Sequence, residues 1–150
     1  MNRLKLLVVA ICSVLLVGCA SVPMTSASLD SEAKQFVPQP GKGSIYINRG
    51  GGLGTALTVQ TLLDGRVVGS LAPNTYQLLS VPPGQHVVST GAGAESVEQQ
   101  MIVVEAGKNY FYRLSLAMGW VAPRVHLRPM SEKEGRKAVV GSKRADAIIY

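Results

Sequence analysis

From residue 43 to about residue 130, apolar and polar positions alternate in short runs, and Gly, Pro, Asn or Asp interrupts them roughly every ten residues. In the first run, SIYINR, Ile45 and Ile47 would share one face of a strand, and Tyr46 and Asn48 the other. Such alternation is typical of strands with one buried face. About eight runs of this kind predict an all-β domain, a β-sandwich of about 7–8 short antiparallel strands, with a barrel as the main alternative.

Turn residues mark the ends of these runs. Asp64 and Gly65 lie between TALTVQTLL and RVVGSL, and Asp-Gly favours a type I′ hairpin because both central positions need a positive φ. TYQLLSV ends at residues 82–84, Pro-Pro-Gly, a sequence typical of a turn. Residues 105–109 are expected to join two further strands. The last strand is RVHLR, with Val125 and Leu127 facing the core.

The C-terminal residues change character after residue 130. Ser131 and Glu134 have the spacing of a capping box, which predicts a short helix over EGRKAVV. Gly135 and Gly141 weaken that helix. The final AIIY is apolar and would add a strand or pack on the sandwich.

The N-terminal residues have the pattern of a secretory signal. Arg3 and Lys5 precede an apolar stretch from residue 6 to residue 17, which is too short to span a membrane. The sequence LVGC at its end, which includes Gly18 and Cys19, resembles a bacterial lipobox. That resemblance implies cleavage between Gly18 and Cys19, and covalent diacylglycerol and N-acyl lipid on Cys19. The alternative is a buried cysteine in an N-terminal helix or an uncleaved anchor.

Lipidation would anchor the chain to a membrane without spanning it. Residue 20 is Ala rather than Asp, so by resemblance to the enterobacterial sorting rule we expect the periplasmic face of the outer membrane. Cys12 would leave with the signal and Cys19 would carry lipid, which leaves no disulfide and no thiol chemistry in the mature domain. The expected organisation is a signal peptide (residues 1–18), a lipidated N-terminus and flexible tether (19–40), a β-sandwich domain (41–130) and a basic C-terminal extension with a short helix (131–150).

The net charge of +6 is unevenly placed. Without the signal, 13 basic and 9 acidic residues give a net charge of +4, all of which lies in residues 124–150. A basic surface of this kind suits anionic lipid head groups, cell-wall carboxylates or an acidic protein, although an ordinary solvated face is the simpler interpretation. Nucleic acid is not an expected partner in the periplasm.

One possible binding surface follows from these charges and from the only tryptophan. If it is exposed, Trp120 is a good interface anchor, whereas burial would make it part of the core. The glycine-rich stretches RGGGLG and GAGAE are candidate recognition tips. The candidate surface residues are Trp120, Arg124, His126, Arg128, Arg136 and Lys137.

Residues for catalysis or metal binding do not form a recognisable pattern. The two histidines, His86 and His126, belong to no spaced ligand motif, and we expect no metal site. No Gly-x-Ser-x-Gly pentapeptide occurs, and the carboxylates are scattered. We therefore expect no enzymatic activity and no cofactor other than the covalent lipid.

Four segments occur in a characteristic order: AKQFVPQPGKGSIYINR, DGRVVGSL, NTYQLLSVPPGQH and AGKNYFYRL. Over about residues 33–130 they resemble a family of bacterial lipoproteins that share domain of unknown function 2846, and more distantly β-sandwich modules named for a Pro-Glu-Gly-Ala motif. Here that motif reads Pro-Pro-Gly-Gln at residues 82–85. The first resemblance implies an immunoglobulin-like or prealbumin-like sandwich on a lipid tether, with no activity established for the family.

These observations favour a non-catalytic binding or assembly accessory of the cell envelope, whose partner would be an envelope protein. A second hypothesis is a structural module that contacts peptidoglycan or lipopolysaccharide through its basic C-terminal surface. A third is a hydrolase with an unrecognised site.

Overall fold

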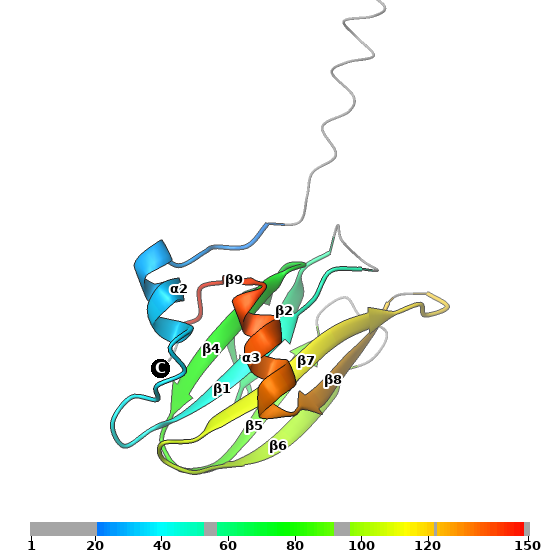
Figure 1. Cartoon of the computed structure of the whole chain (residues 1–150). Helices are drawn as coiled ribbons and strands as arrows, with labels where there is room; N and C mark the ends of the chain where they lie inside the picture. Colours follow the sequence, from blue (N-terminus) through cyan, green and yellow to red (C-terminus); the bar gives the residue numbers. More distant parts are fainter. Residues whose placement is uncertain (1–20, 53–56, 92–96, 122, 149–150) are drawn as a thin grey trace, which may run out of the picture.

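Two β-sheets pack face to face in the computed structural model, which describes residues 21–52, 57–91, 97–121 and 123–148 (Figure 1). The strands are β1 (Gly43–Arg49), β2 (Val59–Leu63), β3 (Arg66–Leu71), β4 (Thr75–Val81), β5 (Gly84–Gly91), β6 (Glu98–Val104), β7 (Asn109–Ala117), β8 (Arg124–Met130) and β9 (Lys143–Arg144). The helices are α2 (Ala27–Ala33) and α3 (Glu132–Val140). The predicted all-β sandwich with a short C-terminal helix is confirmed.

The five-stranded sheet has the order β8-β7-β1-β4-β9, and the four-stranded sheet has the order β3-β2-β5-β6. Most neighbours are antiparallel, but β1 pairs with β7, and β4 with β9, in parallel. The antiparallel expectation fails at these two pairs because neither pair is joined by a hairpin: the chain passes through the four-stranded sheet between β1 and β7, and it reaches β9 through helix α3. Residues 82–84 therefore link the two sheets rather than closing a hairpin.

The β2–β3 hairpin forms as predicted. Asp64 and Gly65 have φ values of 50° and 80°, the positive values that a type I′ turn requires. The Asp64 carboxylate accepts the backbone N–H of Val87 at 2.8 Å, and its other oxygen lies 2.8 Å from Nδ1 of His86. The turn is thereby fixed to the neighbouring strand β5.

Two apolar clusters hold the layers together. The first fills the space between the sheets and includes Ile45 and Ile47 of β1. The second lies between the five-stranded sheet and the helices, where the rings of Tyr46 and Phe111 stack with centroids 5.0 Å apart. All seven residues of β1 are therefore buried, because this strand is covered on both faces.

Helix α3 begins with the predicted capping box. The Ser131 hydroxyl accepts the Glu134 N–H, and the Glu134 carboxylate accepts the Ser131 N–H. Gly135 is buried directly against the ring of Phe111, where an added Cβ would collide with ring atoms. This glycine permits close packing of helix on sheet, a role that its low helix propensity conceals.

The N-terminal segment departs from the predicted flexible tether of residues 19–40. Met24 forms a bridge with Ala145, and helix α2 follows with Ser26 as its N-cap. Phe36 is buried, with its ring 5.4 Å from that of Tyr46. The segment is held by these distant contacts, which local composition does not reveal. Gly18 and Cys19 lie outside the described residues.

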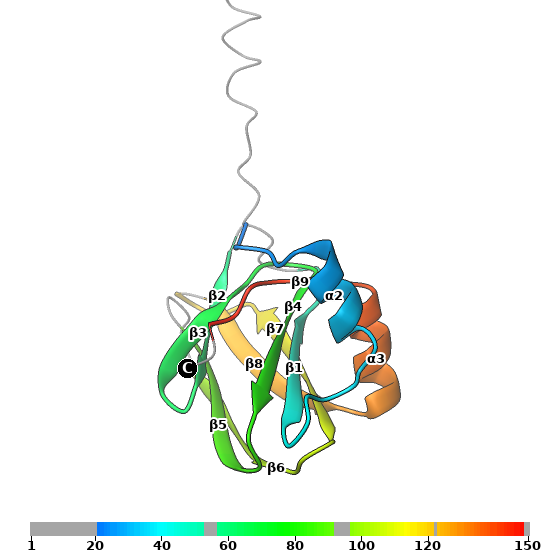
Figure 2. The same cartoon turned by 90° about the vertical axis from the view of Figure 1, so that its left-hand side faces the viewer.

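Both helices lie on the outer face of the five-stranded sheet (Figure 2). Neither helix is long and apolar enough to cross a membrane, and the same is true throughout the described part of the chain. Within the described ranges, no helix lies against the outer face of the four-stranded sheet.

Candidate functional site

Three of the predicted surface residues lie on the outer face of β8. Val125 and Leu127 are fully buried, so the alternating residues Arg124, His126 and Arg128 face outward. Strand register places Arg113 of β7 directly opposite Arg128 and joins it to this group. We call Arg113, Arg124, His126 and Arg128 the basic strip.

Glu98 of β6 lies at the edge of the basic strip. Its Oε1 is 3.2 Å from Nδ1 of His126 and 4.0 Å from Nη2 of Arg128, and its Oε2 accepts the backbone N–H of Leu127. The hydrogen bond from Leu127 lowers the pKa of Glu98, and it outweighs partial burial, with further lowering from His126 and Arg128. His126 is thus paired with a carboxylate that the sequence places 28 residues away.

The seam between β6 and β8 is closed by side chains. The Gln100 amide of β6 donates to the Leu127 carbonyl at 3.2 Å, while Glu98 accepts the N–H of the same residue. At the other edge of the four-stranded sheet, which is formed by β3, the Ile148 N–H of the C-terminal segment donates to the Val68 carbonyl at 2.8 Å. Backbone groups at both sheet edges are therefore already bonded at these residues, which disfavours strand addition there.

The two candidates on α3 have different surroundings. Arg136 bonds to Glu132 through Nε and Nη2 and lies 4.6 Å above the centre of the Phe36 ring, so it is turned toward the segment after α2. Lys137 lines a hollow of about 400 Å³ together with Arg113, Asn48 and Glu134. The structure therefore brings Lys137 to the basic strip and places Arg136 apart from it.

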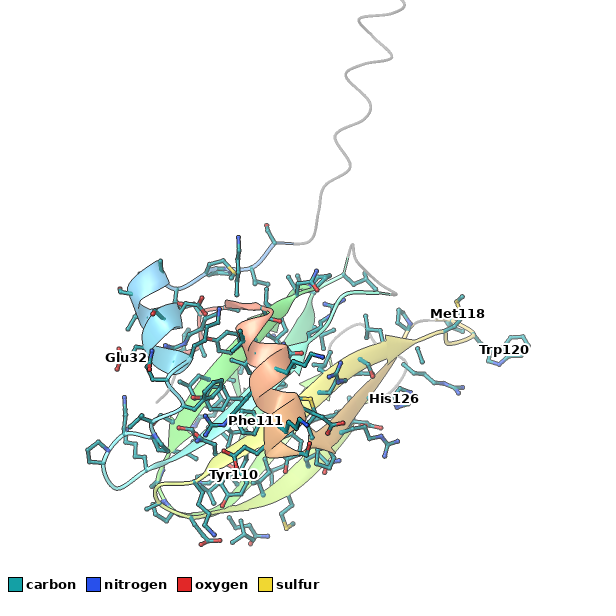
Figure 3. All side chains as sticks on the ribbon, in the orientation of Figure 1. Glu32, Tyr110, Phe111, Met118, Trp120 and His126 are labelled. Atoms are coloured by element: carbon teal, nitrogen blue, oxygen red, sulfur yellow. The ribbon has the colours of Figure 1, made fainter. Side chains whose placement is uncertain are left out.

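Trp120 is exposed at the turn between β7 and β8, so it is not part of the core (Figure 3). Its exposed fraction is 94%, and those of its neighbours Met118 and Val121 are 80% and 93%. We call Met118, Trp120 and Val121 the apolar tip.

The two glycine-rich stretches are described only in part. Most of GAGAE, and residues 53 and 54 of RGGGLG, lie outside the described residues. Arg49, which opens the latter stretch, is 2% exposed, and its Nη1 donates to the carbonyls of Leu57 and Leu71 at 2.6 and 2.8 Å. Burial lowers its pKa. Arg49 therefore stabilises this end of the sandwich from inside.

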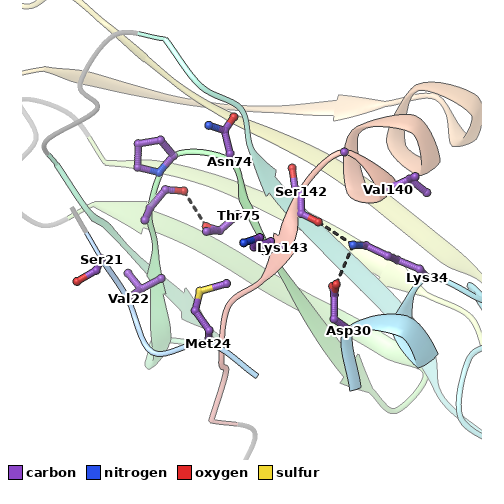
Figure 4. Close-up of a pocket in the computed structure, with 13 residues that line it drawn as sticks. Ser21, Val22, Met24, Asp30, Lys34, Asn74, Thr75, Val140, Ser142 and Lys143 are labelled. Carbon is purple, nitrogen blue, oxygen red and sulfur yellow. Dashed lines mark hydrogen bonds and ion pairs between the residues drawn. The ribbon is translucent and has the colours of Figure 1, made fainter. Parts of the chain in front are cut away.

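A cleft of about 680 Å³ lies beside the N-terminal segment (Figure 4). Across it, Nζ of Lys34 contacts Asp30 Oδ2 and the Ser142 carbonyl, both at 2.8 Å. Burial raises the pKa of Asp30, but hydrogen bonds from Lys34 and Tyr76 and the charge of Lys34 outweigh it and lower the pKa. These charged groups bind each other, so they join α2 to the C-terminal segment. The lining residues are Ser21, Val22, Met24, Asp30, Lys34, Ala72, Pro73, Asn74, Thr75, Val140, Gly141, Ser142 and Lys143.

The four-stranded sheet presents an outward face that the sequence argument missed. Register places Leu62 opposite Val67, Val87 opposite Met101, and Gln85 opposite Val103. Met101 and Val103 are 66% and 68% exposed. We call the following residues the open face: Leu62, Val67, Gln85, Val87, Gln99, Met101 and Val103. None of them carries a charge.

The alternation in EQQMIVV could have identified the exposed side of β6, because the buried Ile102 and Val104 alternate with the exposed Met101 and Val103. What the pattern could not show is which sheet the helices would cover. In the described ranges no group of three or more His, Cys, Asp or Glu side chains is placed to hold a metal ion. His86 bonds with Asp64 and, at 3.0 Å, with the Pro82 carbonyl.

Comparisons with known proteins show which family the chain resembles. The family model described as protein of unknown function DUF2846 matches residues 39–127, so the resemblance inferred from the strand and turn motifs is confirmed. A protein of Haemophilus influenzae, named as uncharacterized, is 34% identical over 128 residues, which cover 85% of this chain and 76% of that protein. The family match includes the whole of the open face and the apolar tip, and it ends before α3.

Proposed function

We propose that this chain, which belongs to the DUF2846 family, is a lipid-anchored, non-catalytic binding module of the bacterial cell envelope that holds a protein partner through its open face. The partner's matching surface would be apolar and uncharged. The expected location is the periplasmic face of the outer membrane, with Cys19 carrying the lipid.

The open face is the observation that carries the proposal. It is an apolar sheet surface, and no helix of the described residues lies against it, although two helices cover the other sheet. Monomeric proteins rarely expose a contiguous apolar patch of more than a few hundred Å², and larger patches commonly mark interaction sites. Since no residue of this face is charged, a partner could cover it without leaving a charge buried and unpaired.

The anchor is supported by the N-terminal sequence and by the docking of residues 23–36. The chain is bonded to the domain as soon as it reaches Pro23, whose carbonyl accepts the Asp146 N–H at 2.8 Å. A lipid on Cys19 would thus hold the whole sandwich near a leaflet. Cys19→Ala should leave an unprocessed precursor that incorporates no palmitate, and palmitate-labelled Cys19→Ala protein of mature size would contradict the anchor.

The basic strip favours a second candidate function. Arg113, Arg124 and Arg128 suit the carboxylates of peptidoglycan or the phosphates of lipopolysaccharide. Such contacts would weaken steeply with ionic strength, whereas an uncharged apolar interface would not.

The test is affinity capture of the native lipidated protein from membranes in mild detergent, at low and at high salt. Val103→Lys puts a charge in the centre of the apolar interface, and we expect it to abolish capture. Val37→Lys is the matched control, because Val37 is 78% exposed and belongs to the loop between α2 and β1 rather than to the open face.

One envelope protein that resists high salt, that is lost with Val103→Lys and that is retained with Val37→Lys would support the proposal. Recovery only of peptidoglycan or lipopolysaccharide, lost at high salt and unaffected by Val103→Lys, would overturn it in favour of the basic strip.

A further inference from the structure

The apolar tip is the most exposed apolar feature of the described residues. Strands β7 and β8 pair from Phe111 and Met130 to Ala117 and Arg124, and the chain then extends beyond the body of the sandwich (Figure 3). Met118, Trp120 and Val121 have the three highest exposed fractions among the large hydrophobic side chains described. They therefore take no part in packing the domain.

The charged residues that flank the tip in the sequence are basic. No Asp or Glu occurs from residue 106 to residue 131. Arg124 is opposite Ala117 at the base of the tip, and His126 and Arg128 of the basic strip follow along β8. Glu98 of the neighbouring sheet contacts the strip at His126, Leu127 and Arg128. An apolar end with tryptophan, followed by arginine, is the order of groups found at a membrane interface, where the ring lies at head-group level and the cation meets phosphate.

The tip and the N-terminal segment lie at the same end of the five-stranded sheet. Residues 21–24 line the cleft beside Asn74 and Thr75, at the start of β4. Thr75 pairs with Arg49 at the end of β1, and Arg49 pairs with Leu114 in the last half of β7, which leads to the tip. This end of the molecule therefore carries both features.

The distance from the anchor to the domain is short. Pro23, where the bonded part of the chain begins, is four positions after Cys19. Even a fully extended chain spans at most about 14 Å over four residues. A lipid on Cys19 would bring the end of the sandwich that bears the tip within reach of the leaflet surface.

We propose that Met118, Trp120 and Val121 insert into the interfacial region of the leaflet that holds the lipid anchor, with the adjoining basic strip facing anionic phospholipid head groups. This inference rests on the proposed lipid anchor. The two attachments would fix the orientation of the domain and turn the open face sideways, toward proteins in the same membrane.

Trp120 is the only tryptophan, so intrinsic fluorescence reports on the tip directly. The full-length lipidated protein is reconstituted into vesicles of phosphatidylethanolamine and phosphatidylglycerol, with and without brominated acyl chains. We expect a blue shift of the emission, protection from acrylamide, and loss of about half of the emission to brominated lipid, since tryptophan favours the interface. Vesicles of phosphatidylcholine alone should give a weaker effect, because they lack the anionic head groups.

The control moves the tryptophan to a site that faces away from the leaflet. Val37 lines a hollow with Ser44 and Ser80, at the opposite end of the five-stranded sheet. In the double variant Trp120→Phe and Val37→Trp, the emission should remain open to acrylamide and insensitive to brominated lipid.

The outcomes separate the tip from the anchor. Wild-type protein that floats with the vesicles but keeps an acrylamide-accessible, unquenched Trp120 would overturn insertion and leave the anchor intact. Protein that does not float with the vesicles would overturn both. Shielding of Trp120 only when envelope proteins are added would assign the tip to a protein partner and overturn the membrane proposal.

Discussion

The Glu98 carboxylate of β6 accepts the backbone N–H of Leu127 in β8 and so joins the two sheets along one seam. The same carboxylate is beside His126, and the neighbouring Gln100 bonds the Leu127 carbonyl. An edge strand usually offers such backbone groups to another chain. Here the protein's own side chains occupy them, which directs recognition away from the edges and toward the open face.

Glu98→Gln should reduce the free energy of unfolding by about 1–2 kcal/mol, because a charge-assisted hydrogen bond becomes a neutral one. Urea denaturation at pH 7 measures the change. Glu105→Gln is the matched control, since Glu105 is exposed and pairs with the exposed Lys108, and it should change stability by less than about 0.5 kcal/mol. Equal effects of the two substitutions would contradict the sealing role of Glu98.

The Glu98 contribution should also depend on pH. Because the folded state lowers its pKa, the contribution is complete above pH 4.5, the ordinary pKa of this group, and is lost as the pH falls through the lowered value. The difference in unfolding free energy between the wild type and Glu98→Gln should therefore become smaller as the pH falls below 4.5. A difference that stays constant over that interval would assign the stabilisation to packing alone.

Gly135→Ala tests the packing of α3 on the five-stranded sheet. Alanine would raise helix propensity by about 1 kcal/mol, but its Cβ would collide with Phe111, and we expect net destabilisation of about 1–3 kcal/mol. Gly141→Ala is the control, because its φ is −77° and a Cβ there meets carbonyl oxygens only at 3.6 Å and beyond. Thermal unfolding of both variants measures the contrast, and a stabilised Gly135→Ala protein would show that α3 does not pack as described.

Asp30→Asn should loosen α2 without unfolding the sandwich. Asp30 accepts from Lys34, Tyr76 and the Arg144 N–H, so loss of its charge weakens three contacts at once. We expect residues 24–36 to exchange amide hydrogen about tenfold faster, which corresponds to about 1.4 kcal/mol. Glu32→Gln, on the exposed side of the same helix, should leave exchange unchanged.

Local chemistry made part of this architecture predictable. The Asp64–Gly65 turn and the Ser131–Glu134 capping box each depend on a few neighbouring residues, and both were foreseen from spacing alone. The docking of α2 was not, because Asp30 meets Tyr76 across 46 residues of sequence. Local pattern carries no information on such contacts.

In the candidate site, too, local patterns predicted some features, whereas contacts between distant segments determined the others. Alternation in RVHLR placed Arg124, His126 and Arg128 on one face, as the structure has them. The open face could not be assigned from the sequence, because the sequence does not show which of the two sheets α3 covers. In the structure α3 turns back over β7 of the five-stranded sheet, and the four-stranded sheet is left without a helix from the described residues. Exposure of Trp120 depended likewise on how far the β7–β8 hairpin extends beyond the core.

The most direct test of the central claim is site-specific photocrosslinking in cells that express the native lipidated chain, with the crosslinker at Met101 of the open face, at Arg128 of the basic strip, or at Val37. The account predicts one envelope protein crosslinked from Met101 at low and high salt alike, and none from Val37. Crosslinking confined to Arg128 and lost at high salt, with nothing captured from Met101, would contradict it.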